Sequence, residues 1–192
     1  FHKNMTVIDK PKIEKSRKKP YTHITWKTDF KRFGISSFSE DMVSFMVRRI
    51  YDVAGITDKR VSLFYNGTKL KIKSFQDYIN LYPSPTTKTY EKISDRWELI
   101  VCPSSNDKFE QVSFVNGIAT PKGGVHVDCI VKQIMTAVVA YIKKKHKREI
   151  PEKYVKNYLS IYLNCVIENP SFDSQTKERL ITPKSKFGSK PV

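Results

Sequence analysis

A polar run near the carboxyl end of the chain offers side chains that could hold an anion. Residues 168–177 follow an alternating apolar stretch and contain few apolar side chains. Pro170 lacks a backbone donor and biases Asn169 away from helix, so the chain must turn there. The run ends in Gln175, Thr176 and Lys177, an amide, a hydroxyl and an ammonium that can all donate to phosphate oxygens. The alternative interpretation is a solvated turn before a basic tail.

A cluster of basic residues marks a second candidate site. Residues 143–148 read Lys-Lys-Lys-His-Lys-Arg. Lys143, Lys144 and Lys145 could contact DNA phosphates, which gives binding that weakens with salt and does not select sequence. The alternative is a helix end whose cations interact favourably with the helix dipole. The formal net charge of +16, from 35 Lys and Arg against 19 Asp and Glu, favours a nucleic-acid contact.

Other polar residues give weaker indications. The run Lys122-Gly123-Gly124 before a helix could form an anion-binding nest, although the spacing of a Walker A loop is absent and a flexible connection is the alternative. His126 is expected to cap or pack. Glu168 and Asp173 are expected to organise the polar run, Asp173 by accepting from backbone donors near Gln175.

Composition excludes several kinds of site. The three cysteines, an odd number, are widely spaced and the four histidines are scattered, so neither a disulfide framework nor a metal site is expected. No apolar run approaches the ~20 residues that span a bilayer, and no membrane partner is expected. The first residues resemble neither a secretory signal nor a natural start, so the chain is expected to be a piece of a longer protein.

Periodicity and turn chemistry predict the elements that position these residues. Alternation predicts strands at 21–26, 97–102, 111–119 and 159–165. Asn66-Gly67 predicts a type I′ hairpin between 61–65 and 70–72. Expected helices are one opened by a capping box at 37–40 and ended by Gly55, a short one over 75–81, and a long one after Gly124. The Pro-containing stretch 82–89 predicts a loop or domain boundary.

Four stretches together resemble eukaryotic DNA topoisomerase II, a type IIA enzyme. They are Tyr51-Asp52-Val53-Ala54-Gly55, Ser113-Phe114-Val115-Asn116-Gly117-Ile118-Ala119-Thr120, Lys122-Gly123-Gly124-Val125-His126-Val127-Asp128, and the run from Asn164-Cys165-Val166-Ile167-Glu168 to Lys177. Their order and spacing match the family as well, and the resemblance covers essentially the whole chain.

The resemblance implies an α+β fold in two parts. Residues 1–84 would be the carboxyl-terminal part of a GHKL-type nucleotide-binding domain. Residues 85–192 would be a transducer domain of ribosomal protein S5 domain 2-like fold, a sheet with a right-handed βαβ crossover and a long helix on one face. The implied partners are ATP, Mg²⁺, double-stranded DNA and a second copy at the dimer's N-gate, in the nucleus.

The resemblance also implies residue roles. Gln175, Thr176 and Lys177 would reach into the ATP pocket, with Lys177 on the γ-phosphate. Lys143, Lys144 and Lys145 would contact DNA, with Lys122 a weaker candidate. Most of the ATP and Mg²⁺ site would lie upstream of Phe1 and the cleavage tyrosine downstream, so the isolated segment is not expected to be active. The implied function is coupling of ATP binding and hydrolysis to gate closure and passage of a DNA duplex.

Two other interpretations stay open on the sequence. Composition alone fits a non-enzymatic basic module with an S5-like fold that binds nucleic acid. It also fits a basic interaction domain whose lysine runs are solvated. The run from Gln175 to Lys177 distinguishes the topoisomerase interpretation from the S5-like module, which does not require it. Phosphate-dependent protection of Lys177 in the full-length protein would exclude the basic interaction domain.

Overall fold

The computed structural model describes residues 1–83 and 87–191, which separate into two compact units, 1–38 and 39–192. The first unit is mostly irregular, with a turn at residues 29–34 and edge-on contacts of Phe38 with Trp26 and Phe30. The prediction of a strand at 21–26 is wrong. A strand needs a hydrogen-bonded neighbour, and no described segment pairs with this one.

The second unit begins with helix α1 (Glu40–Ile56). Its N-cap is Ser39, whose hydroxyl accepts from the Met42 amide, so the predicted capping box at 37–40 is displaced by two residues. The prediction that Gly55 ends the helix is also wrong, because the helix continues to Ile56 and Gly55 instead lies against Tyr78. A Cβ on Gly55 would come within 2.4 Å of the Tyr78 Cβ.

The predicted hairpin turn and short helix are confirmed, but the second strand lies at 68–69 and not at 70–72. Strands β1 (Phe64–Tyr65) and β2 (Thr68–Lys69) are antiparallel. Asn66 and Gly67 take φ values of 47° and 76°, as a type I′ turn requires. Helix α2 (Phe75–Ile79) follows, capped by the Ser74 hydroxyl.

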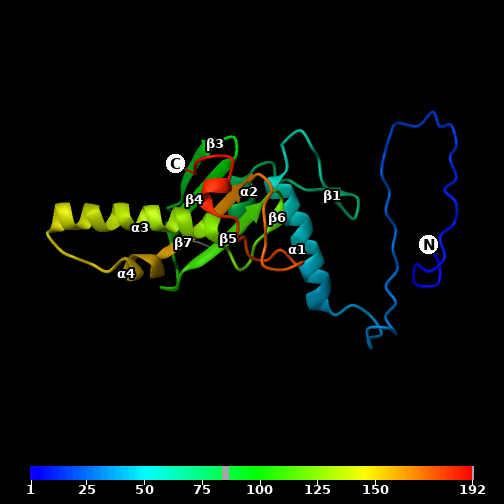
Figure 1. Cartoon of the computed structure of the whole chain (residues 1–192), viewed down its shortest axis with the longest axis horizontal. Helices are drawn as coiled ribbons and strands as arrows, with labels where there is room; N and C mark the ends of the chain where they lie inside the picture. The colour runs from blue at the N-terminus through cyan, green and yellow to red at the C-terminus, as the bar shows by residue number, and fades with distance from the viewer. Residues whose placement is uncertain (84–86, 192) are drawn as a thin grey trace. The chain divides into compact units, whose positions relative to one another are not determined.

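A five-stranded sheet forms the centre of the unit, in the order β3-β4-β7-β5-β6 (Figure 1). Strands β5 and β7 are parallel neighbours joined through a long helix, and the other pairs are antiparallel. Their bounds are β3 (Thr89–Ser94), β4 (Trp97–Pro103), β5 (Glu110–Val115), β6 (Ile118–Ala119) and β7 (Leu159–Cys165).

The sequence predicted β4 and β7 closely but not the rest of the sheet. Strand β3 was not predicted. Residues 111–119 were expected to form one strand and instead form the β5–β6 hairpin. Asn116 and Gly117, with φ values of 50° and 77°, make its turn.

Alternation along the strands gives the sheet two apolar faces. Leu99, Leu163 and Val115 lie on the face that packs against helix α3 (Val125–His146). Ile100, Tyr162 and Phe114 lie on the face that packs against α2. Strand β7 is buried on both faces almost throughout, although its sequence alternates and includes the polar residues Ser160 and Asn164.

Helix α3 bears on the expectation that no apolar run is long enough to span a membrane. By length and composition, α3 is the one described helix that could cross a bilayer, which is weak evidence because the core helix of a soluble protein passes the same test. Val127, Ile130 and Val131 on α3 are buried in the core against the sheet. Helix α4 (Glu152–Asn157), which was not predicted, packs beside it.

The expected boundary between residues 84 and 85 falls among residues outside the described ranges. On its amino-terminal side, α2 packs Phe75 and Tyr78 against Phe114 of β5, with ring centroids 6.3 and 5.9 Å apart. The compact unit therefore includes α1 and α2 together with the sheet.

One polar network is buried where β5, β6 and α3 meet. The hydroxyls of Ser113 and Thr120 lie 2.5 Å apart, and the Thr120 hydroxyl lies 3.2 Å from Nε2 of His126. His126 is fully buried, as the packing interpretation expected, and its Nδ1 has no hydrogen-bond partner in the described structure. Burial lowers the pKa of His126 to about 3, so the ring is neutral in the folded protein at neutral pH.

We predict that Gly55→Ala lowers the free energy of unfolding by about 1–3 kcal/mol, because the new methyl group overlaps Tyr78. At a solvent-exposed position inside a helix, Gly→Ala instead raises the free energy of unfolding by about 1 kcal/mol. Urea unfolding followed by circular dichroism measures the difference. Ser44→Ala, at an exposed position of the same helix, is the control and should be neutral or slightly stabilising. A stabilised Gly55→Ala protein would contradict the prediction.

We predict that acid destabilises the fold through His126. Below pH ~6.5 the unfolded chain binds a proton at this ring, whereas the folded chain does so only near pH 3, so stability is full above pH 6.5 and falls as pH is lowered. The loss is about 2 kcal/mol at pH 5. Urea unfolding at pH 7.5 and 5.0 should show a smaller pH effect in His126→Gln than in the parent. An equal pH effect in both proteins would rule out this role for His126.

Candidate functional site

The polar run that the sequence singled out forms a loop with an anchored base. Phe172 and Leu180 form an antiparallel bridge. The Asp173 amide donates to the Arg179 carbonyl (3.2 Å), and the Ile181 amide donates to the Ser171 carbonyl (2.9 Å). Leu180 is fully buried. Residues 174–178 therefore project from a base that is held on both sides.

Lys177 lies at a tight turn in this loop. Its amide donates to the Ser174 carbonyl (3.1 Å), and its φ of 59° is left-handed. Its ammonium lies 5.9 Å from the Phe172 ring centroid, and no carboxylate of the described chain pairs with it. A cation placed over a ring and left without a counter-ion is available to an external anion.

Gln175 and Thr176 are both exposed beside Lys177. The Thr176 hydroxyl lies 3.0 Å from that of Ser174. The expected turn in which Asp173 accepts from a backbone donor near Gln175 is not found, because the Asp173 carboxylate accepts from the Ser174 hydroxyl (3.2 Å) instead. The three predicted residues are thus adjacent on one loop, with Gln175 and Thr176 exposed and Lys177 partly exposed.

The loop also connects to the start of α3. The Leu180 amide donates to the Gly123 carbonyl (3.0 Å), and the Leu180 carbonyl accepts from the Val125 amide (3.1 Å). This close approach requires glycine at 124, since a Cβ there would lie 2.2 Å from the Leu180 carbonyl oxygen. The structure does not support an anion-binding nest at 122–124, because the amides of Lys122, Gly123 and Val125 already donate to main-chain carbonyls.

Lys122 lies beside the loop and not beside the lysine cluster. Its ammonium pairs with the carboxylate of Glu178, which raises the pKa of Lys122. The cluster at 143–145 lies at the other end of α3, a helix of 22 residues and about 33 Å. The structure therefore does not bring the weaker DNA candidate together with the stronger ones.

The lysine cluster occupies the last turn of α3, where cations also interact favourably with the helix dipole. Lys143 pairs with Glu149 (2.6 Å), and Lys145 donates to the Tyr141 hydroxyl (2.8 Å). All three lysines are exposed. The helix ends at His146, and its C-cap residue Lys147 has a left-handed φ of 55°. The arrangement presents several cations at one exposed tip, which is the kind of surface that binds a phosphate backbone.

Asn116 and Arg96, neither of which the sequence singled out for a role, help to position the loop. The Asn116 side chain donates to the Ile167 carbonyl (2.9 Å) and accepts from the Ile167 amide (2.8 Å), which fixes the chain as it leaves β7. Glu168 then pairs with Arg96 (2.8 Å), in agreement with its expected role as a loop organiser. The Asn116-Gly117 dipeptide, which is typical of a tight turn, was the sequence feature that could have drawn attention to Asn116.

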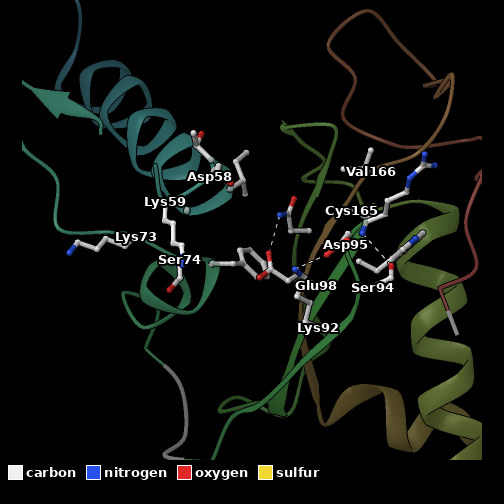
Figure 2. Close-up of a pocket in the computed structure, with 17 residues that line it drawn as sticks. Asp58, Lys59, Lys73, Ser74, Lys92, Ser94, Asp95, Glu98, Cys165 and Val166 are labelled. Atoms are coloured by element: carbon white, nitrogen blue, oxygen red, sulfur yellow. Dashed lines mark hydrogen bonds and ion pairs between the residues drawn. The ribbon is translucent and has the colours of Figure 1, made fainter. Parts of the chain in front are cut away.

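Several cavities lie in the second unit, and two of them are lined in part by polar residues that bear on a site. One, of about 530 Å³, is bounded by α1, β5, β6 and the loop residues Thr176 and Glu178. The other, of about 410 Å³, lies between the end of α1, the start of α2 and the β3–β4 turn (Figure 2). Its charged groups are mostly paired, as Lys92 with Asp95 (2.9 Å), so it offers no acid or base poised for catalysis. No group of three or more His, Cys, Asp or Glu side chains among the described residues could hold a metal.

Comparisons with known proteins identify the fold and the chain. The family described as DNA gyrase B matches residues 64–191. DNA topoisomerase 2 of Arabidopsis thaliana is 43% identical over 202 residues, covering 99% of this chain and 14% of that protein. The probable DNA topoisomerase 2 of Dictyostelium discoideum is 45% identical over 198 residues, covering 99% and 13%. The chain thus spans about one seventh of these relatives.

Solved structures agree. The ATPase region of Saccharomyces cerevisiae topoisomerase II superposes with a TM-score of 0.77 at 40% identity, covering 84% of this chain and 42% of that chain. The ATPase and transducer domains of DNA topoisomerase II from Balamuthia mandrillaris give 0.75 at 41%, covering 79% and 38%. The mixed α+β fold is therefore that of this region. The chain belongs to the eukaryotic DNA topoisomerase II family, as a segment of its ATPase and transducer region.

Proposed function

We propose that this chain contributes one edge of an ATP site and one DNA-facing surface to a type IIA topoisomerase. In the whole protein it couples ATP binding and hydrolysis to closure of the N-gate and passage of a DNA duplex. The observation that carries the proposal is the position of the Lys177 ammonium. In the described structure it has no carboxylate partner, and it lies on a loop whose two ends are joined by the bridge between Phe172 and Leu180. The domain division at residues 84 and 85, GHKL-type before it and transducer after it, belongs to the same proposal.

Lys177 acts by neutralising charge on the γ-phosphate. Phosphoryl transfer depends mostly on positioning and on stabilising the charge that spreads over the phosphate oxygens. A lysine ammonium in a fixed turn supplies both. Gln175 orients the γ-phosphate or the attacking water through its exposed amide, and Thr176 adds a hydroxyl beside it. Mg²⁺ would be held mainly by residues of the whole protein outside this segment, and it would supply further shielding of the phosphate charge.

The lysine cluster supplies the contact with double-stranded DNA. Lys143, Lys144 and Lys145 lie on one exposed helix tip, and phosphate contacts require charge and reach but no base readout. A second copy of the protein completes the N-gate, and the nucleus, where relatives act on DNA, is the proposed location. Lys122 has less support as a DNA contact because Glu178 holds its ammonium.

We predict that Lys177→Ala lowers ATP turnover by about 100-fold or more and changes DNA affinity little, because it removes a cation that acts on the transition state. Turnover is measured in a protein that carries this chain within the complete ATPase region. Lys184→Ala, at an exposed lysine seven residues further along the chain, is the matched control and should retain turnover. Equal loss of turnover and DNA affinity, or unchanged hydrolysis, would count against the proposal and favour a non-enzymatic nucleic-acid-binding module.

We predict that changing Lys143, Lys144 and Lys145 together to Gln flattens the salt dependence of DNA binding. Each lost phosphate contact reduces the slope of log K against log salt by about 0.9, so three contacts reduce it by about 2.7. DNA-stimulated hydrolysis should weaken as well. The control changes Lys69, Lys71 and Lys73 to Gln, which removes the same charge from exposed positions elsewhere. An equal slope change in both variants would show that only net charge matters.

A further inference from the structure

Two segments that are far apart in the sequence meet beside the Lys177 loop. The Lys122 amide donates to the Glu178 carbonyl (3.0 Å), and Leu180 is hydrogen-bonded to Gly123 and Val125. The side chains of Lys122 and Glu178 also pair. Glu178, the residue after Lys177, is therefore held by both its main chain and its side chain to the loop that opens α3.

This ion pair is poorly placed to stabilise the fold. The Lys122 side chain is 64% exposed and that of Glu178 is 35% exposed, and ion pairs in such surroundings contribute little to stability. The main-chain hydrogen bonds already hold the segments together, and the absence of a side chain at Gly124 allows the close approach that they need. The pair therefore calls for an explanation other than stability.

The charge of Glu178 supplies that explanation. A carboxylate next in sequence to Lys177 competes with an incoming phosphate for the ammonium and also repels the phosphate directly. Lys122 draws this carboxylate to its own ammonium and offsets its charge. The Lys177 ammonium, which is left over the Phe172 ring, is then free to meet an anion.

We propose that Lys122 is a positioning residue for Lys177. By holding Glu178, it keeps the carboxylate away from the phosphate site and ties the loop to the first turn of α3. This inference rests on the proposed contact between Lys177 and the γ-phosphate. It assigns Lys122 to the nucleotide side of the molecule, in place of the DNA contact that the resemblance suggested.

A charge swap tests the proposal in a protein that carries the complete ATPase region. Lys122→Glu and Glu178→Lys each place like charges side by side at the base of the loop, and each should lower kcat/KM for ATP about tenfold, since small misplacements of a reacting group have large effects. The double variant restores the pair and should recover to within about twofold. Single variants with parental kcat/KM, or a double variant no better than the singles, overturn the proposal.

A second ion pair gives a matched control. Lys132 and Glu152 have nearly the same exposure, 64% and 37%, but link α3 to α4 away from the loop. Lys132→Glu, Glu152→Lys and their double variant should leave kcat/KM for ATP unchanged. A tenfold loss in these variants would show that any reversed pair disturbs the protein, and would overturn the specific role of Lys122.

Hydrogen exchange provides a readout that does not depend on hydrolysis. Amides of residues 173–180 should exchange faster in both single variants and regain protection in the double variant, while the thermal midpoint stays within a few degrees of the parent. Unchanged exchange in the single variants overturns the proposal.

Lys177→Ala, measured in the same experiment, distinguishes a failure of the proposed function from a failure of the proposed role of Lys122. If it retains hydrolysis, the proposed function fails and the inference fails with it. If Lys177→Ala loses hydrolysis while the swap variants behave as the parent, only the role of Lys122 fails. A reduced salt slope of DNA binding in Lys122→Glu that the double variant does not restore would return Lys122 to the DNA surface and overturn the proposal.

Discussion

The arrangement of the site depends on the main-chain pairing of Leu180. This buried residue is hydrogen-bonded through its amide and carbonyl to Gly123 and Val125, and it bridges Phe172 on its other side. The pairing is possible only because Gly124 has no side chain. A backbone that is fully hydrogen-bonded and buried has no alternative partners in the protein interior, so the segment has one position. The polar loop, the first turn of α3 and the tail beyond residue 180 all take their positions from it.

The sheet supplies the frame for this pairing. Strand β7 lies in its middle and is buried on both faces. The chain leaves β7 toward Ile167, which is hydrogen-bonded to the Asn116 side chain. One face of the sheet carries α3 and the other carries α2. The loop and the lysine cluster are thus connected through packed elements, although they lie about 33 Å of helix apart.

Much of this frame could be predicted from the sequence because it follows local rules. The long apolar stripe of α3, the alternation in β7 and the Asn66-Gly67 turn each indicate their structure without knowledge of neighbours. The same dipeptide at 116–117 was missed because the apolar pattern of β5 continues directly into β6, and a run of apolar residues hides a turn. Gly55 was interpreted as a helix end by its local preference, whereas its neighbour Tyr78 lies 23 residues later.

The candidate site was predictable only in part. The residue types of Gln175, Thr176 and Lys177 indicated an anion site, but nothing local indicated that Glu178 would pair with Lys122, because that contact joins segments more than fifty residues apart. The expected strand at 21–26 failed for a related reason. Alternation gives a strand its faces, but only another segment gives it hydrogen bonds.

Helix α3 has the anchored loop at one end and the lysine cluster at the other. Leu180 is hydrogen-bonded to the start of this helix, so the loop and the first turn of α3 are held together. Over about 33 Å, a rotation of the helix by about 5° displaces the far tip by about 3 Å. That is roughly the length of a hydrogen bond, and so the difference between a lysine that touches a phosphate and one that does not.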